Sequence, residues 1–155
     1  MARKSRDRLP DAVLFACNLN RVRSPMAEAL LKHMLGDRVF VDSCGLKPVA
    51  ADEGGEGGGV DPLAREVMRE IGVDILDHRA KTFDDLDDES FDLVVSLTPE
   101  AQHRAVEMTR GRAVDIEYWP TFDPTLAEGA REARLDAYRE VRDALMARIR
   151  ARFGA

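Results

Sequence analysis

A cysteine, an arginine and a serine stand at the junction of two predicted elements near the start of the chain. The apolar run 12–16 leads into Cys17, and Arg23 and Ser24 follow after a five-residue loop, where an amphipathic segment begins. Backbone N–H groups of such a loop can point inward at an anion, and the helix N-terminus adds positive potential that favours a thiolate. The Arg23 guanidinium can bind two anion oxygens at once. The sequence therefore predicts an oxyanion-binding loop with a nucleophile at its floor.

The residues around Arg23 fit this interpretation. Asn20 tolerates the left-handed backbone conformation that helps a loop curl around an anion. The Ser24 hydroxyl can donate a hydrogen bond to the thiolate of Cys17. The alternative is that Cys17 is an inert buried thiol and Arg23 a solvated helix residue. The predicted phosphate-binding loop comprises Asn18, Leu19, Asn20, Arg21, Val22 and Ser24.

A thiolate that attacks phosphorus expels an alkoxide or phenoxide, and this leaving group needs a proton. Asp123 is the best candidate for the acid, because it follows the fourth predicted strand and Pro124 would stiffen its backbone. A simple turn or helix-capping role for Asp123 is the alternative. The acidic run 84–89 precedes the third predicted strand, at the opposite edge of the sheet, and is predicted to be a solvated turn.

Strand and helix patterns alternate along the chain. Short connections between them imply an α/β fold of three layers, with a parallel sheet covered by helices on both faces. In such sheets ligands bind beyond the carboxyl ends of the strands, where Cys17 falls. The predicted strands are 12–16, 39–41, 91–95 and 114–118, and the predicted helices cover 24–35, 61–71, 99–108 and the apolar stripe 135–153.

Length and composition describe one ordinary domain. The chain has 155 residues and a net charge of −6, which argues against general nucleic-acid binding. No run of about 20 apolar residues predicts a membrane span, and the two cysteines make no disulfide framework, so we expect cytoplasmic residence. Residues 1–10 are predicted to be a flexible basic tail, with weak lipid or nucleic-acid contact as a minor option, and 11–155 a single domain. The Gly-rich stretch 53–59 is predicted to be a flexible surface loop.

The chain resembles the low-molecular-weight protein-tyrosine-phosphatase and arsenate-reductase superfamily over nearly its whole length after the tail. The residues that carry the resemblance are Cys17 to Pro25, the pair Asp42-Ser43, His78 within 77–80, and Asp123-Pro124. The resemblance implies a four-stranded parallel sheet in the order 2-1-3-4. It also implies an enzyme that works without a metal or other cofactor, and no ligand cluster with metal-binding spacing is present in the sequence.

The resemblance assigns a role to each matching residue. Cys17 would be the nucleophile, Arg23 would bind the oxyanion, and Asp123 would be general acid and then general base. Four residues would support the loop: Asn20, Ser24, Ser43 and His78. His33 and His103 lie in helical patterns and are expected to be surface or packing residues.

The chain departs from the family pattern around the substrate. Leu19 stands where the family loop usually has Gly, and a branched side chain there could narrow the pocket. Tyrosine phosphatases of the family place aromatic residues after Asp-Pro, where this chain has Thr125 and Leu126. The opposite wall usually comes from the loop after the second strand, which here is Gly-rich and lacks aromatics. A phosphotyrosine ring would therefore have few stacking partners.

The number of cysteines limits how this chain could reduce arsenate, the second activity of the superfamily. No cysteine follows Cys44, so the three-cysteine relay of thioredoxin-coupled arsenate reductases is excluded. Trp119 and the Gly129 region nevertheless resemble the arsenate-reductase branch. An external thiol, such as glutathione with glutaredoxin, could complete arsenate reduction. Cys44 is either a small residue that fills its site or a resolving thiol beside Cys17.

The resemblance and these departures give three functional hypotheses. The first is a phosphomonoester phosphatase of the protein-tyrosine type, with a phosphocysteine intermediate and a phosphorylated protein or small phosphomonoester as substrate. The second is an arsenate reductase that uses an external thiol. The third is a non-catalytic oxyanion-binding or regulatory module. None of these involves nucleic acid or a membrane, and the oligomeric state is left open.

Overall fold

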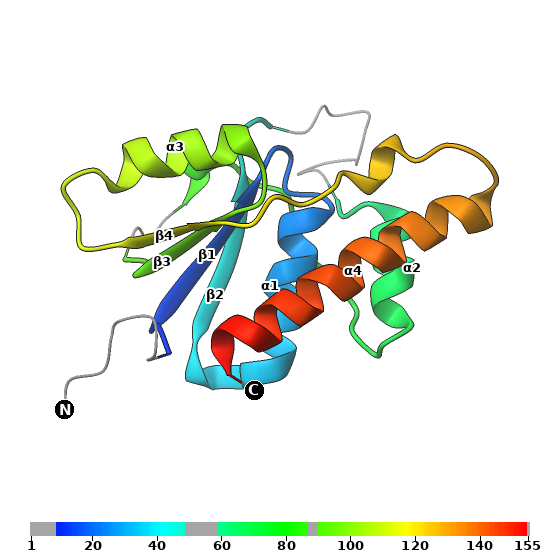
Figure 1. The fold of residues 1–155 in the computed structure, drawn as a ribbon, viewed down its shortest axis with the longest axis horizontal. Helices are drawn as coiled ribbons and strands as arrows, with labels where there is room; N and C mark the ends of the chain where they lie inside the picture. The colour runs from blue at the N-terminus through cyan, green and yellow to red at the C-terminus, as the bar shows by residue number, and fades with distance from the viewer. Residues whose placement is uncertain (1–8, 49–58, 87–89, 155) are drawn as a thin grey trace.

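Four parallel strands form one sheet in the order β2-β1-β3-β4 (Figure 1). The structure is a computed structural model, and it describes residues 9–48, 59–86 and 90–154. The α/β fold and the predicted strand order 2-1-3-4 are confirmed. The strands are β1 (Ala12–Cys17), β2 (Phe40–Gly45), β3 (Leu93–Ser96) and β4 (Asp115–Tyr118), and the described helices are α1 (Arg23–Leu35), α2 (Pro62–Arg69), α3 (Pro99–Thr109) and α4 (Arg131–Phe153).

Side chains of β1 alternate between the two faces of the sheet and divide the core into two parts. Val13 and Phe15 are fully buried in the cluster that also contains the apolar faces of α1, α2 and α4. Leu14 and Ala16 are buried in a smaller cluster with the apolar face of α3. Helices therefore cover both faces of the sheet, as the alternation of elements predicted (Figure 1).

Local capping explains where the helices begin. The Asp61 side chain accepts hydrogen bonds from the N–H groups of the second and third residues after it, and Pro62 opens α2. The Thr98 hydroxyl caps α3 by accepting from the Ala101 N–H, and Pro99 is the first helical residue. Gly36, with φ of +57°, ends α1 at the predicted position.

The second strand is longer than predicted. The sequence predicts a strand over 39–41, whereas β2 runs from Phe40 to Gly45 and pairs with β1 along its whole length. The polar pair Asp42-Ser43 follows the predicted strand, but Ser43 is buried in β2 and its hydroxyl has hydrogen-bond partners. A satisfied buried polar group does not interrupt a strand. The extension carries Ser43 and Gly45 under the Cys17 loop.

Three predictions lie partly outside the described residues. These are the basic tail at 1–8, the Gly-rich loop at 53–58 and the end of the acidic run at 87–89. Within the described part of that run, Phe83–Asp85 form a short 3-10 turn in which the Asp85 carboxylate accepts from Thr82. Across the described ranges, no helix has the length and apolar character to span a membrane.

Candidate functional site

The Cys17 thiol lies at the carboxyl end of β1, under the loop that leads into α1. Its Sγ atom is 2.9 Å from the Ser24 hydroxyl and 3.3 Å from the backbone nitrogen of Asn20, which donates to it. Asn20 has φ of +60°, the left-handed conformation that the sequence predicted for it. The loop thus closes over the thiol and directs donors at it.

The end of β2 supports the loop through a close backbone contact that the sequence did not predict. A Cβ atom on Gly45 would stand 2.8 Å from the Asn18 carbonyl oxygen and 2.9 Å from the Asn20 nitrogen. The Asn18 carbonyl accepts from the Leu46 nitrogen at 2.8 Å, and its side-chain oxygen accepts from the Thr98 hydroxyl at 2.8 Å. Only a glycine fits at this position without displacing the loop.

A chain of buried hydrogen bonds braces the loop from behind. The Asn20 amide nitrogen donates to the hydroxyls of Ser24 and Ser43, at 2.8 and 2.9 Å. The Ser43 hydroxyl donates in turn to the Glu28 carboxylate at 2.5 Å. Three of the four predicted supports therefore meet. Glu28 was missed, although it lies one helical turn after Ser24 on the same face of α1, a spacing that could have revealed it.

The segment 78–81 fixes the orientation of Asn20 from the other side. The Lys81 backbone N–H donates to the Asn20 side-chain oxygen at 3.0 Å, so the amide nitrogen must face the two serines. His78 Nε2 lies 2.9 Å from the Asn20 carbonyl oxygen. A carbonyl only accepts, so this nitrogen carries the proton. Burial lowers the pKa of His78, which keeps the ring neutral, although the hydrogen bond to Asn20 opposes this shift.

Arg23 connects the loop to the segment that follows β4. Its Nη1 atom donates to the Thr121 carbonyl at 3.0 Å, and its Nη2 atom is 3.8 Å from an Asp123 carboxylate oxygen. Asp123 also accepts from the Thr125 nitrogen and hydroxyl, at 3.0 and 2.7 Å. The turn-capping role left open for Asp123 is therefore present. Asp123 fills this role and also lies beside Arg23.

The predicted nucleophile, anion-binding arginine and acid open onto one cavity of about 270 Å³. Ser24, Ser43 and His78 do not line this cavity, since they lie behind the loop. The sequence missed Lys47 and Asp61 as lining residues, whereas Thr125 lines the cavity at the position where the resemblance places a substrate wall. Asp61 caps α2 with one carboxylate oxygen, and its other oxygen accepts from the Tyr138 hydroxyl at 3.1 Å. The cavity is lined by Cys17, Asn18, Leu19, Asn20, Arg21, Val22, Arg23, Lys47, Asp61, Asp123 and Thr125.

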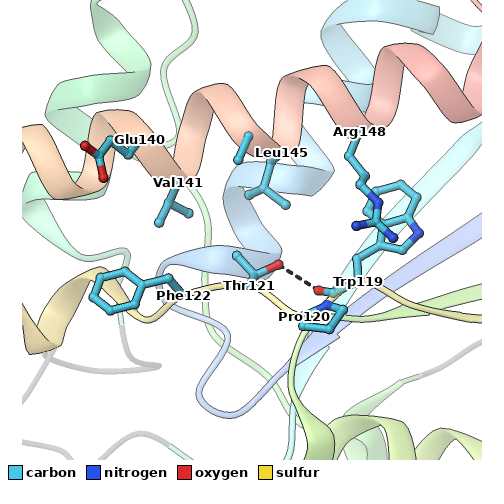
Figure 2. Close-up of a pocket in the computed structure, with 9 residues that line it drawn as sticks. Trp119, Pro120, Thr121, Phe122, Glu140, Val141, Leu145 and Arg148 are labelled. Carbon is cyan, nitrogen blue, oxygen red and sulfur yellow. Dashed lines mark hydrogen bonds between the residues drawn. The ribbon is translucent and has the colours of Figure 1, made fainter.

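A second pocket of similar size lies behind the segment that carries Asp123 (Figure 2). It is bounded by residues 119–122 on one side and by α4 on the other. Figure 2 shows the Phe122 ring on the α4 side of this segment, near Val141 and Glu140. The aromatic residue next to Asp123 therefore lines this second pocket. It is not among the residues that line the cavity above Cys17.

Cys44 is buried on the other face of the sheet. It pairs with Ala16 and packs in the α3-side cluster, whereas Cys17 belongs to the cluster on the opposite face. Burial, with Cys17 and Asp42 nearby, raises the pKa of the Cys44 thiol, which disfavours the reactive thiolate. This arrangement favours the space-filling interpretation of Cys44 over a resolving thiol.

Known proteins are similar to this chain in sequence and in fold. A family model described as low molecular weight phosphotyrosine protein phosphatase matches residues 12–152. The arsenate reductase of Shouchella clausii is 35% identical over 139 residues, which cover 89% of this chain and 91% of that protein.

Two solved structures of related proteins have a similar fold. A low molecular weight protein tyrosine phosphatase from T. tengcongensis has a TM-score of 0.70 and 28% identity, covering 89% of this chain and 94% of that one. An arsenate reductase in its phosphate-binding state has a TM-score of 0.73 and 26% identity, covering 93% and 97%. The chain therefore belongs to the low molecular weight phosphotyrosine protein phosphatase family, whose phosphatases and arsenate reductases are cysteine-dependent enzymes.

Proposed function

We propose that the protein is a phosphomonoester phosphatase that works through a phosphocysteine intermediate. One observation carries this proposal: the Cys17 thiol, the Arg23 guanidinium and the Asp123 carboxylate all open onto one cavity. A nucleophile, an anion-binding fork and an acid are the parts that displacement at phosphorus requires. The substrate is a phosphorylated protein or a small phosphomonoester.

In the first step the Cys17 thiolate attacks phosphorus and the bond to the leaving oxygen breaks. Arg23 and the loop N–H groups bind the equatorial oxygens, where negative charge must be stabilised. Asp123, in its protonated form, gives its proton to the leaving oxygen. The products are a neutral alcohol, a phosphocysteine and the Asp123 carboxylate.

In the second step the Asp123 carboxylate takes a proton from water as the water oxygen attacks phosphorus. The sulfur–phosphorus bond breaks, which releases inorganic phosphate and restores the Cys17 thiolate. The Ser24 hydroxyl supports both steps, because its position 2.9 Å from Sγ lets it stabilise the thiolate as nucleophile and as leaving group.

Arsenate reduction is the second candidate, favoured by the 35% identity to an arsenate reductase. Attack of Cys17 on arsenate would release water and form a Cys17–arsenate adduct. The chain holds only one other cysteine, on the opposite face of the sheet, so an external thiol must complete the reaction. The first external thiol would form a mixed disulfide with Cys17 as arsenic(V) is reduced to arsenite. A second thiol would release Cys17.

A paired assay tests these candidates on the full chain. Hydrolysis of p-nitrophenyl phosphate is measured beside arsenate-dependent oxidation of glutathione with glutaredoxin. We expect hydrolysis in the wild type, none in Cys17→Ser, and unchanged hydrolysis in the control Cys44→Ala. Hydrolysis that survives Cys17→Ser would refute the mechanism.

The remaining outcomes of the assay choose between the alternatives. Arsenate turnover with negligible hydrolysis would replace the phosphatase proposal with the second candidate. Phosphate binding without either activity would replace it with a non-catalytic oxyanion-binding module.

A further inference from the structure

Leu19 lies at the mouth of the catalytic cavity. Leu19 is one of the residues that line the cavity, and it is 39% exposed. The main chain of Leu19 lies against Gly45, where an added Cβ would be only 2.9 Å from the Leu19 carbonyl carbon. Among the described residues other than glycine, only Asn20 has a positive φ, so a branched residue fits at position 19 without backbone strain. Leu19 therefore leaves the cradle formed by the loop intact and presents an aliphatic group beside it.

No aromatic ring lines this cavity within the described ranges. Every aromatic residue of the chain falls inside those ranges, so the remaining segments have none to offer. Phe122 lines the second pocket against α4 (Figure 2) and, with Tyr118, a further pocket beside Arg23 and Asp123, so neither ring lines the cavity above Cys17. Thr125 lines the cavity where an aromatic wall would be expected from the resemblance. A leaving group bound above Cys17 thus meets an aliphatic side chain and polar groups.

We propose that Leu19 contacts the leaving group and makes the site favour phosphomonoesters of saturated carbon over aryl phosphates in binding. A branched aliphatic side chain packs against saturated carbon through dispersion and apolar burial, which need no flat partner. A phenyl group lacks here the ring-to-ring contact that would add roughly two- to tenfold in affinity. The inference rests on the proposed function only in requiring that the cavity binds a phosphoryl group.

Two phosphonates of equal carbon count test this preference without depending on leaving-group chemistry. Benzylphosphonate and cyclohexylmethylphosphonate differ in ring saturation, and inorganic phosphate reports on the loop alone. Binding is measured by calorimetry with the wild type, Leu19→Ala and Leu19→Phe. The matched control is Leu126→Ala, which removes a 70% exposed leucine that does not line the cavity.

We expect cyclohexylmethylphosphonate to bind the wild type more tightly, and Leu19→Ala to weaken it by about three- to tenfold. Leu19→Phe should move the ratio of the two affinities toward benzylphosphonate. Comparing this ratio between variants cancels the intrinsic difference in hydrophobicity between the two rings. The affinity for inorganic phosphate is measured with every variant, so that any change in the loop itself is divided out of the two phosphonate affinities. Leu126→Ala should match the wild type.

Three results would overturn the inference while leaving the proposed function intact. These are tighter binding of benzylphosphonate to the wild type, a ratio unchanged by both Leu19 substitutions, or an equal effect of Leu126→Ala. Failure of the wild type to bind either inorganic phosphate or the phosphonates would instead refute the proposed function, and the inference with it.

Discussion

The Ser43 hydroxyl donates to the Glu28 carboxylate at 2.5 Å, and this contact ties the hydrogen bonds behind the loop to α1. Because its proton is committed to Glu28, Ser43 can only accept from the Asn20 amide. The other Asn20 amide proton goes to Ser24. The Ser24 hydroxyl proton is therefore free to point at Cys17 Sγ. The Lys81 N–H thus sets the direction of these hydrogen bonds by orienting the Asn20 amide, and Glu28 supplies the acceptor that the Ser43 proton needs.

Glu28→Leu should leave the Ser43 hydroxyl without its acceptor and loosen the support of Asn20, because leucine has similar size and cannot accept the Ser43 proton. We expect about a tenfold loss of kcat/KM, a similar fall in the rate at which iodoacetamide alkylates Cys17, and destabilisation by about 1–3 kcal/mol from the unsatisfied hydroxyl. The control is Lys32→Met, which removes the other partner of Glu28, at 2.5 Å, and leaves the network intact. An equal effect of both substitutions would assign the loss to the ion pair.

Asp123→Asn tests the proposed general acid through the leaving group. An amide cannot deliver the proton, so kcat for an alkyl phosphate should fall by about 10²- to 10⁴-fold. The fall should be much smaller for p-nitrophenyl phosphate, whose leaving group departs without protonation. Asp84→Asn, an exposed carboxylate 3.3 Å from Arg104, serves as the control and should change neither rate. Equal losses for both substrates would indicate that Asp123 only positions Arg23.

Local patterns predicted the parts of the site that depend on neighbours in sequence. Cys17 and Arg23 were found because a buried strand, a loop and a helix start follow one another there. Asp123 was found because parallel strands bring their carboxyl ends to one edge. Gly45 and Lys81 were missed, since each meets the loop through backbone atoms from far along the chain, and a backbone contact leaves no side-chain pattern.

The boundaries of β2 likewise depend partly on local pattern and partly on contacts between distant residues. Hydrophobic pattern alone ended the second strand at Val41, because Ser43 reads as polar. Its burial is stabilised by Asn20 and Glu28, and both contacts exist only after the loop and α1 have packed against β2. The strand order, in contrast, came from the family resemblance and not from any local signal.

Gly45→Ala should disturb the loop through sterics alone. Its Cβ would stand 2.8 Å from the Asn18 oxygen, closer than such atoms approach, so the loop or β2 must shift. We expect destabilisation by about 1–3 kcal/mol and at least about a tenfold loss of phosphate affinity by calorimetry. Gly36→Ala is the matched control, because its φ of +57° also disfavours alanine while no atom lies within 4 Å. It should lower the unfolding free energy and leave phosphate affinity unchanged.

His78 should make stability depend on pH near neutrality. Burial lowers its pKa below the ordinary 6.5, so between those two values the unfolded chain binds a proton that the folded protein does not. The free energy of unfolding must then rise with pH across this window and fall as pH drops below about 6.5. Urea unfolding between pH 5.5 and 7.5 measures this slope.

The variant His78→Gln removes the titrating ring while its amide can still donate to the Asn20 carbonyl. We expect the slope of unfolding free energy against pH to be smaller in this variant than in the wild type. His103→Gln, on the exposed face of α3, should keep the wild-type slope. A wild-type slope in His78→Gln would show that another group carries the dependence. A slope of opposite sign in the wild type would mean that the folded protein binds the proton more tightly. The hydrogen bond to Asn20, with Glu28 and Asp42, would then raise the pKa of His78 by more than burial lowers it.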